Sequence, residues 1–132
     1  MVYKIMYPPI PNMGDLLNKD MLEELFNIKV VRKDLKSCNL IAIGSALDHI
    51  MYSTYPRIRA KQKIEHFIND NVHIWSTGFI RGNAELDLGL IFRHIHIHAL
   101  RGRLSLQRME NILGKKLDVP TGDGGLLAER WL

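Results

Sequence analysis

The chain has 132 residues, of which 46% are hydrophobic, and a formal net charge of +4 at pH 7. This length suits one domain, and the share of apolar residues is enough for a buried core, which excludes a disordered chain. The positive charge favours anionic partners in general, but the basic residues are scattered, and this argues against the continuous stripe that binds nucleic acids.

The lack of targeting signals and the cysteine content narrow the class of protein further. No apolar run approaches the ~18 residues that span a bilayer, and the start, MVYKIMYPP, lacks the length and cleavage pattern of a signal peptide. We therefore expect a cytoplasmic protein without a transmembrane segment. The single cysteine, Cys38, excludes an intramolecular disulfide, and its place before an apolar strand favours a small core residue over a nucleophile.

The first third of the chain predicts a strand, a turn and a helix. Val2–Tyr7 alternates as a strand does, and three prolines then stop it: Pro8, Pro9 and Pro11. Asn12–Asp15 reads as a turn whose acidic end suits a helix start, and the helix is expected to run to about Asn27. Its buried stripe consists of Leu16, Leu17, Met21, Leu22, Leu25 and Phe26.

The middle of the chain alternates short strands with a helix. Ile28–Val31 and Asn39–Ile43 predict strands, the second covered on both faces. Pro56 suits the first position of a helix that ends near residues 69–71, and Val72–Trp75 predicts the next strand. Ile80–Leu90 is interrupted by glycines and predicts a loop with a short helix or turn.

The last third contains the most distinctive stretch, in which an alternating pattern changes into a helical one. His94–His98 places three histidines on one face and isoleucines on the other, as in a strand. After the turn at Arg101 and Gly102, five apolar residues recur at helical spacing before Gly114: Leu104, Leu106, Met109, Ile112 and Leu113. Beyond it, Lys115–Val119 is the candidate for a last strand, and 126–132 for a helical start.

This alternation of strands and helices predicts a Rossmann-like α/β fold, a parallel sheet with flanking helices. The carboxyl ends of parallel strands meet at one edge, where such proteins bind ligands. We expect that edge to bring four residues into one crevice: Asn12, Gly44, Thr77 and Arg101.

Four motifs stand at or near these predicted strand ends. They are N-M-G-D-L-L-N at 12–18, L-I-A-I-G-S-A-L at 40–47, I-W-S-T-G-F at 74–79 and A-L-R-G-R-L-S at 99–105, the last running on to T-G-D at 121–123. Together they resemble the polysaccharide pyruvyl transferases of the exopolysaccharide type, which carry similar N-x-G-D-x-L-N, I-G-S, W-G-T-G-F, R-G-x-L-S and G-D-P segments. The chain departs from that pattern at Ser76, where glycine is usual, and at Gly124, where proline is usual.

The resemblance implies a function and a larger architecture. Members of the family transfer the enolpyruvyl group of phosphoenolpyruvate onto two hydroxyls of a sugar, as a ketal, without a cofactor or metal. They resemble two-lobed glycosyltransferases of the GT-B type, and residues 1–132 match the first lobe. The implied partners are phosphoenolpyruvate, a saccharide acceptor and a second lobe or partner chain. A lipid-linked saccharide would also bring the protein to a membrane.

Ketal formation explains which residue types such a site needs. Arginine binds a carboxylate or phosphate with two parallel hydrogen bonds, and Arg101 is the candidate for this role. Asp15 is the candidate acid or base. The remaining substrate-binding candidates are Asn12, Gly14, Gly44, Ser45, Thr77 and Gly78. A surface charge or helix-end ion pair is the alternative for Arg101, a helix cap for Asp15, and simple turns for the glycines.

Two further alternatives stay open. Three imidazoles on one strand face can bind zinc, but the sequence shows no clear fourth ligand, and a polar strand face covered by another element is the simpler reading. The chain could also be a binding-only remnant or interaction module, or a different nucleotide-binding α/β protein. The G-x-G-x-x-G fingerprint expected for the last is absent from the sequence.

Overall fold

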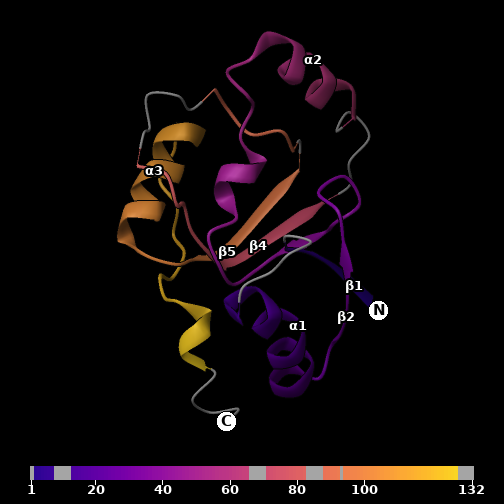
Figure 1. Cartoon of the computed structure of the whole chain (residues 1–132). Coiled ribbons are helices and arrows are strands. Elements are labelled where there is room, and N and C mark those ends of the chain that lie inside the picture. The colour runs from indigo at the N-terminus through magenta and orange to yellow at the C-terminus, as the bar shows by residue number, and fades with distance from the viewer. Residues whose placement is uncertain (1, 8–12, 66–70, 83–87, 93, 128–132) are drawn as a thin grey trace.

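The computed structural model describes residues 2–7, 13–65, 71–82, 88–92 and 94–127, and for residues 13–16 the backbone alone. Its centre is a sheet of five parallel strands in the order β2-β1-β3-β4-β5 (Figure 1). The strands are β1 Val2–Met6, β2 Lys29–Lys33, β3 Leu40–Ile41, β4 Val72–Thr77 and β5 Ile95–Leu100. The predicted parallel α/β architecture is therefore confirmed.

Helices cover both faces of this sheet. They are α1 Met13–Phe26, α2 Pro56–Glu65 and α3 Arg103–Leu113, with 3-10 helices η1 Leu47–Ile50 and η3 Gly124–Leu127. Leu22 of α1 packs with Ile5 and Val30 on one face. On the other face, η1 and α3 complete a larger core: Met6, Cys38, Ile41, Leu47, Ile50, Val72, Ile74, Ile91, Phe92, Leu100 and Met109. Among the described residues, no helix is long and apolar enough to cross a membrane.

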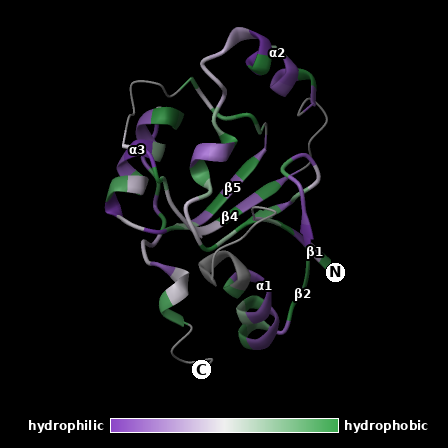
Figure 2. Ribbon diagram, in the orientation of Figure 1, coloured by the Kyte–Doolittle hydropathy of each residue, from purple (hydrophilic) through white to green (hydrophobic). Residues whose placement is uncertain are grey.

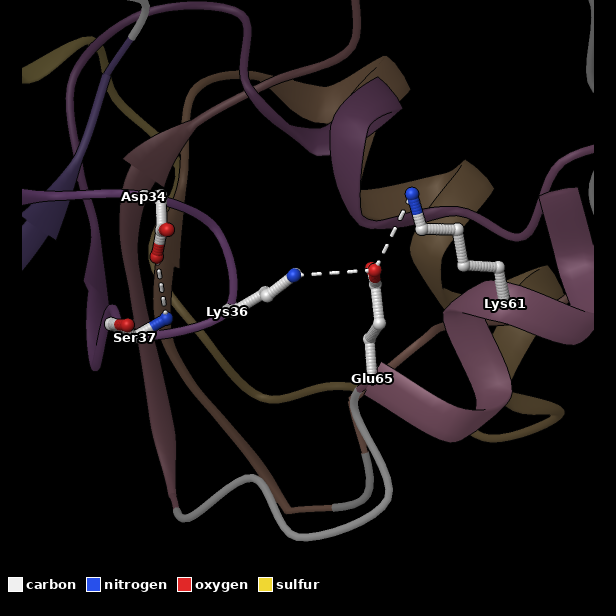
Figure 3. A network of polar contacts seen from close by, with 5 residues as sticks. All are labelled: Asp34, Lys36, Ser37, Lys61 and Glu65. Carbon is white, nitrogen blue, oxygen red and sulfur yellow. Dashed lines mark hydrogen bonds and ion pairs between the residues drawn. The ribbon is translucent and has the colours of Figure 1, made fainter.

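Helix α2 has no buried residue and is largely hydrophilic (Figure 2). Polar contacts fix its position instead. Lys36, in the turn after β2, and Lys61 place their ammonium groups 3.2 and 3.6 Å from the Glu65 carboxylate (Figure 3). Burial opposes ionisation of Glu65, but the two lysines lower its pKa below the ordinary value. Ion pairs at an exposed surface contribute little to stability, so α2 is weakly held.

Several elements differ from the prediction in their bounds or their kind: the strands, for example, run over Lys29–Lys33, Leu40–Ile41, Val72–Thr77 and Ile95–Leu100 rather than Ile28–Val31, Asn39–Ile43, Val72–Trp75 and His94–His98. Helix α1 begins at Met13, so Gly14 and Asp15 lie in its first turn rather than in a preceding turn. The predicted strand Lys115–Val119 is wrong, because the Glu110 side chain accepts the backbone N–H of Leu117 at 3.0 Å and holds this segment beside α3. Gly124–Leu127 forms a 3-10 helix where a helical start was expected at 126, and residues 128–132 lie outside the described part.

The buried face of α3 also differs from the expected apolar stripe. Met109 is buried as predicted, but Leu104 is 81% exposed, whereas Ser105 is buried in its place. Gly114 closes the helix as expected, in the left-handed conformation at φ +67°, and its N–H donates to the Glu110 carbonyl at 2.8 Å. Glycine adopts this conformation without strain from a Cβ atom.

Candidate functional site

The strand order locates the crevice in which an α/β sheet binds ligands. Strand β1 pairs with β2 on one side and with β3 on the other, so the order reverses between β1 and β3. Ligands bind outside the carboxyl ends of the strands at such a reversal. On one side of this reversal, β1 is followed by α1, whose first turn contains Gly14 and Asp15. Asn12 lies outside the described residues, and only the backbone of Gly14 and Asp15 is described.

Gly44 and Ser45 flank the other side, and Arg101 connects them to the ends of β4 and β5. One terminal nitrogen of the Arg101 guanidinium donates to the Gly44 carbonyl at 3.3 Å and to the Ser45 hydroxyl. The other donates to the Phe79 carbonyl at 2.8 Å. The backbone N–H of Arg101 donates to the Thr77 carbonyl at 2.9 Å. The predicted meeting of Gly44, Thr77 and Arg101 at one edge is confirmed.

The Gly44 carbonyl is the common acceptor at this edge. Besides Arg101, it accepts hydrogen bonds from the Thr77 hydroxyl at 3.0 Å and from the Gly78 N–H at 3.1 Å. Gly44 has φ +117°, a conformation that side chains rarely permit, and this backbone turn positions its carbonyl. A Cβ atom on Gly78 would lie 2.7 Å from Nε of Arg101. Glycine at position 78 therefore leaves room for the Arg101 guanidinium.

Two residues of the quoted motifs have roles that the sequence did not reveal. Asn18 ends the first motif and is buried in α1, where its side-chain nitrogen donates to the Ile43 carbonyl at 3.0 Å. Ser105 ends the fourth motif, and its hydroxyl accepts the backbone N–H of Phe79 at 3.4 Å. Their positions inside the motifs indicated that both residues matter. Their hydrogen-bond partners could not be predicted, because these lie far away in the sequence. The motif residues thus hold one another's segments in position.

Ser76 links the third motif to the T-G-D segment. Its φ is +62°, in the left-handed region that favours glycine. Its buried hydroxyl donates to the Gly122 carbonyl and accepts the N–H of Gly124. These two bonds offset the backbone strain of a residue with a Cβ atom. A glycine at this position would avoid the strain but would lose both bonds.

We expect Ser76→Ala to lower the free energy of unfolding by about 2 kcal/mol, because it keeps the strained conformation and loses two hydrogen bonds. Ser76→Gly should cost about 1 kcal/mol less than Ser76→Ala, because it releases the strain. Urea denaturation of both variants measures the difference. An alanine variant as stable as the glycine variant would show that residue 76 is unstrained in solution.

A polar hollow is lined by residues of η1, of the segment between η1 and α2, and by Arg81 and Arg108. The Arg108 guanidinium stands 4.1 Å from the centre of the Phe79 ring and also donates to the Arg81 carbonyl. Asp48 of η1 accepts the N–H groups of Ile80 and Arg81. The hollow measures about 310 Å³, and Tyr52 and Tyr55 line it with the polar residues. Aromatic rings, carboxylates and arginines in one hollow suit polar ligands such as sugars and phosphates. No motif in the sequence indicates these residues.

The histidines form a cluster that differs from the predicted one. His94 lies in a bend before β5, whereas His73 of β4, which the sequence did not single out, stacks on both His96 and His98 at ring distances of 5.0 and 5.1 Å. Nδ1 of His73 lies 2.8 Å from Nε2 of His98. Stacked rings direct their lone pairs along parallel planes, not toward a common point. Accordingly, no three His, Cys, Asp or Glu side chains in the described part are placed to hold a metal ion.

The histidine cluster predicts a loss of stability in mild acid. Burial, with the neighbouring His98 and His96 imidazoles, lowers the pKa of His73 below its ordinary value of 6.5. His73 therefore binds a proton more readily in the unfolded chain than in the folded one. The stability that neutral His73 contributes is complete above pH ~6.5 and is lost as the pH falls through the folded-state pKa. The midpoint of urea denaturation should fall when the sample is acidified. We expect a smaller fall for His73→Asn than for the unaltered chain. Equal falls would contradict this.

Cys38 behaves as the core residue that the sequence predicted. It is buried in the larger core cluster, and its thiol lies 3.4 Å from the Leu35 carbonyl. Burial raises the pKa of the thiol to about 12. A nucleophile or metal ligand must be a thiolate, which this environment disfavours.

Fold and site together define a parallel α/β protein with helices on both faces of its sheet and a carboxyl edge in which motif residues bind one another. No protein-family model, no curated protein and no solved structure matches the chain.

Proposed function

We propose that the chain is the first lobe of a polysaccharide pyruvyl transferase and contributes to binding phosphoenolpyruvate and its saccharide acceptor. One observation carries this proposal. The segments that resemble that family lie far apart in sequence, yet they meet at one edge and are hydrogen-bonded through their own motif residues: Asn18 to Ile43, Thr77 and Arg101 to Gly44, Ser105 to Phe79, and Ser76 to Gly122. Motifs that shared a function would be expected to meet in this way.

The proposed role of Arg101 is an exchange of partners. Its guanidinium now donates to the Gly44 carbonyl, the Ser45 hydroxyl and the Phe79 carbonyl, which are all neutral. Hydrogen bonds between two charged groups are shorter and stronger than those with one neutral partner. A carboxylate or phosphate that reaches this edge can replace two of these acceptors as a bidentate partner. The α3 N-terminus, which begins two residues later, adds favourable partial positive charge.

The transfer itself needs groups on both sides of the ligand. A proton must reach the methylene carbon of the enol, and two acceptor hydroxyls must lose theirs, for which Asp15 in the first turn of α1 is the candidate. Positioning the reactants contributes on the order of 7–11 kcal/mol in the best intramolecular cases. One lobe leaves the ligand open to water on one side, so we expect residues 1–132 alone to release little phosphate from phosphoenolpyruvate in the presence of a saccharide.

A second candidate function is a binding or interaction module without catalysis. The observation that favours it is that the structure already gives the Arg101 guanidinium internal acceptors. In that case Arg101 holds three loops together, and the edge docks a partner lobe or an anionic ligand that is not transformed.

Titration of the labelled chain with phosphoenolpyruvate, followed by amide chemical shifts, tests the proposal. We expect saturable shifts at residues 44–45, 77–79 and 101. Arg101→Lys keeps the charge but removes the two-pronged geometry, and it should weaken binding about tenfold or more. Arg103→Lys is the matched control, because Arg103 is exposed at the start of α3. Unchanged shifts at saturating ligand would overturn the proposal. Binding without turnover, even with the second lobe of a pyruvyl transferase added, would favour the interaction module.

A further inference from the structure

Strand β5 forms one border of the sheet, and most of its outer edge has no strand beside it. Among the described residues, backbone partners on this edge are found at Leu100, its last residue: its N–H donates to the Pro120 carbonyl at 3.1 Å, and its carbonyl accepts the N–H of Gly122 at 2.9 Å. Within the described part of the chain, the sheet ladder ends at β5. An uncovered edge presents N–H and C=O groups to any strand that can pair with it.

The two borders of the sheet are protected differently. The opposite border strand, β2, carries three cations in five residues: Lys29, Arg32 and Lys33. Charged residues on a border strand oppose the addition of another strand. Strand β5 has the sequence IHIHAL, without lysine, arginine, acid or proline. In the part of the chain that the structure describes, one border is therefore protected by charge and the other carries no such protection.

A hollow of about 560 Å³ runs beside this open border. Four consecutive residues of β5, 95–98, line it. Because successive side chains of a strand point to opposite faces, a hollow that all four residues reach must follow the edge of the strand. The other residues that line it are mostly apolar and include Leu90, Phe92, Ile112, Leu113 and Leu117. The border thus combines an apolar wall with a strand edge that no other described strand pairs with.

The pattern of β5 indicates which strand would fit. The stretch His94–His98 reads the same in both directions, so an antiparallel copy can place histidine beside histidine and isoleucine beside isoleucine. The strand already pairs like with like on its inner side, where His96 lies opposite His73 and Ile97 opposite Ile74. The imidazoles there stack at 5.0 and 5.1 Å, so this polar face accepts neighbouring histidines.

We propose that the β5 border is a self-association surface, at which β5 pairs antiparallel with β5 of a second copy of this chain. His96 lies at the two-fold axis opposite its own copy, and Ile95 lies opposite Ile97 of the other copy. The two sheets then form one continuous sheet with a protected β2 strand at each end. This proposal is independent of the proposed transferase function, because it uses no residue of the carboxyl edge.

Sedimentation equilibrium of the chain tests the proposal. The mass should rise with concentration from 15.2 kDa to about 30 kDa, twice the monomer value, at a pH of about 7.5, where histidines are mostly neutral. The double variant His96→Lys with His98→Lys places like charges opposite one another across the two-fold axis, and both residues are exposed, so the fold should persist. The matched control is His49→Lys with Gln107→Lys, which adds the same charge at exposed positions outside β5.

We expect the β5 variant to stay monomeric and the control to dimerise like the unaltered chain. A monomeric unaltered chain at all concentrations, or a β5 variant that dimerises as well as the control, would overturn the proposal. Amide hydrogen exchange on the unaltered chain gives a second measurement that needs no variant. Exchange at residues 95–99 should slow as the concentration rises, and exchange that does not depend on concentration in a dimeric sample would place the interface elsewhere.

Discussion

Replacing Arg101 with alanine should lower the free energy of unfolding by about 3 kcal/mol, since hydrogen bonds to a charged group contribute roughly 1.5–3 kcal/mol each and this side chain is only partly buried. The change removes the donor to the Gly44 carbonyl, the Ser45 hydroxyl and the Phe79 carbonyl at once. These acceptors belong to the loops after β3 and β4, so the loops also lose their connection to β5. Urea denaturation followed by circular dichroism measures the loss.

Two companion variants separate geometry from charge. Arg101→Lys retains a cation that can reach one acceptor but not three, and we expect roughly half the loss. Arg103→Ala removes an arginine two residues away that is exposed, and it should change stability by less than about 0.5 kcal/mol. If Arg101→Ala and Arg103→Ala were equally stable, the guanidinium contacts would contribute nothing to the fold.

The second large effect is expected at Gly124, where alanine should cost about 3 kcal/mol by combining overpacking with a lost hydrogen bond. A Cβ atom there would stand 2.9 Å from the Trp75 indole and 3.0 Å from the Ser76 hydroxyl. The indole cannot move freely, because it packs edge-on against the Phe26 ring, with centroids 5.6 Å apart. The displaced backbone would also lose the bond from the Gly124 N–H to Ser76.

Gly122→Ala provides the control for that substitution. Gly122 belongs to the same segment, but a Cβ atom there meets nothing within 4 Å. Thermal denaturation should leave this variant within about 0.5 kcal/mol of the unaltered chain, as expected for a substitution without a clash. Equal losses at positions 122 and 124 would mean that the segment tolerates alanine poorly for reasons other than contact with Trp75.

Local periodicity was enough to predict most elements of this fold. The alternation in Val2–Met6 and the helical spacing after Arg101 are properties of neighbouring residues, and the structure confirms both a strand and a helix there. The prediction failed where a contact from elsewhere decides the conformation. Lys115–Val119 has a strand-like composition, but the Glu110 carboxylate binds its backbone. Leu104 is exposed, whereas the neighbouring Ser105 is buried and accepts the N–H of Phe79, a partner that periodicity does not indicate.

The candidate site, like the fold, could be predicted from the sequence only in part. The sequence alone placed Gly44, Thr77 and Arg101 at one edge, because the carboxyl ends of parallel strands must share an edge. Only the tertiary structure decided the strand order, and with it the crevice between β1 and β3. It also decided which acceptors the Arg101 guanidinium meets, and that His73 rather than His94 joins the histidine stack. These contacts join segments more than 20 residues apart, and periodicity carries no information about partners at such separations.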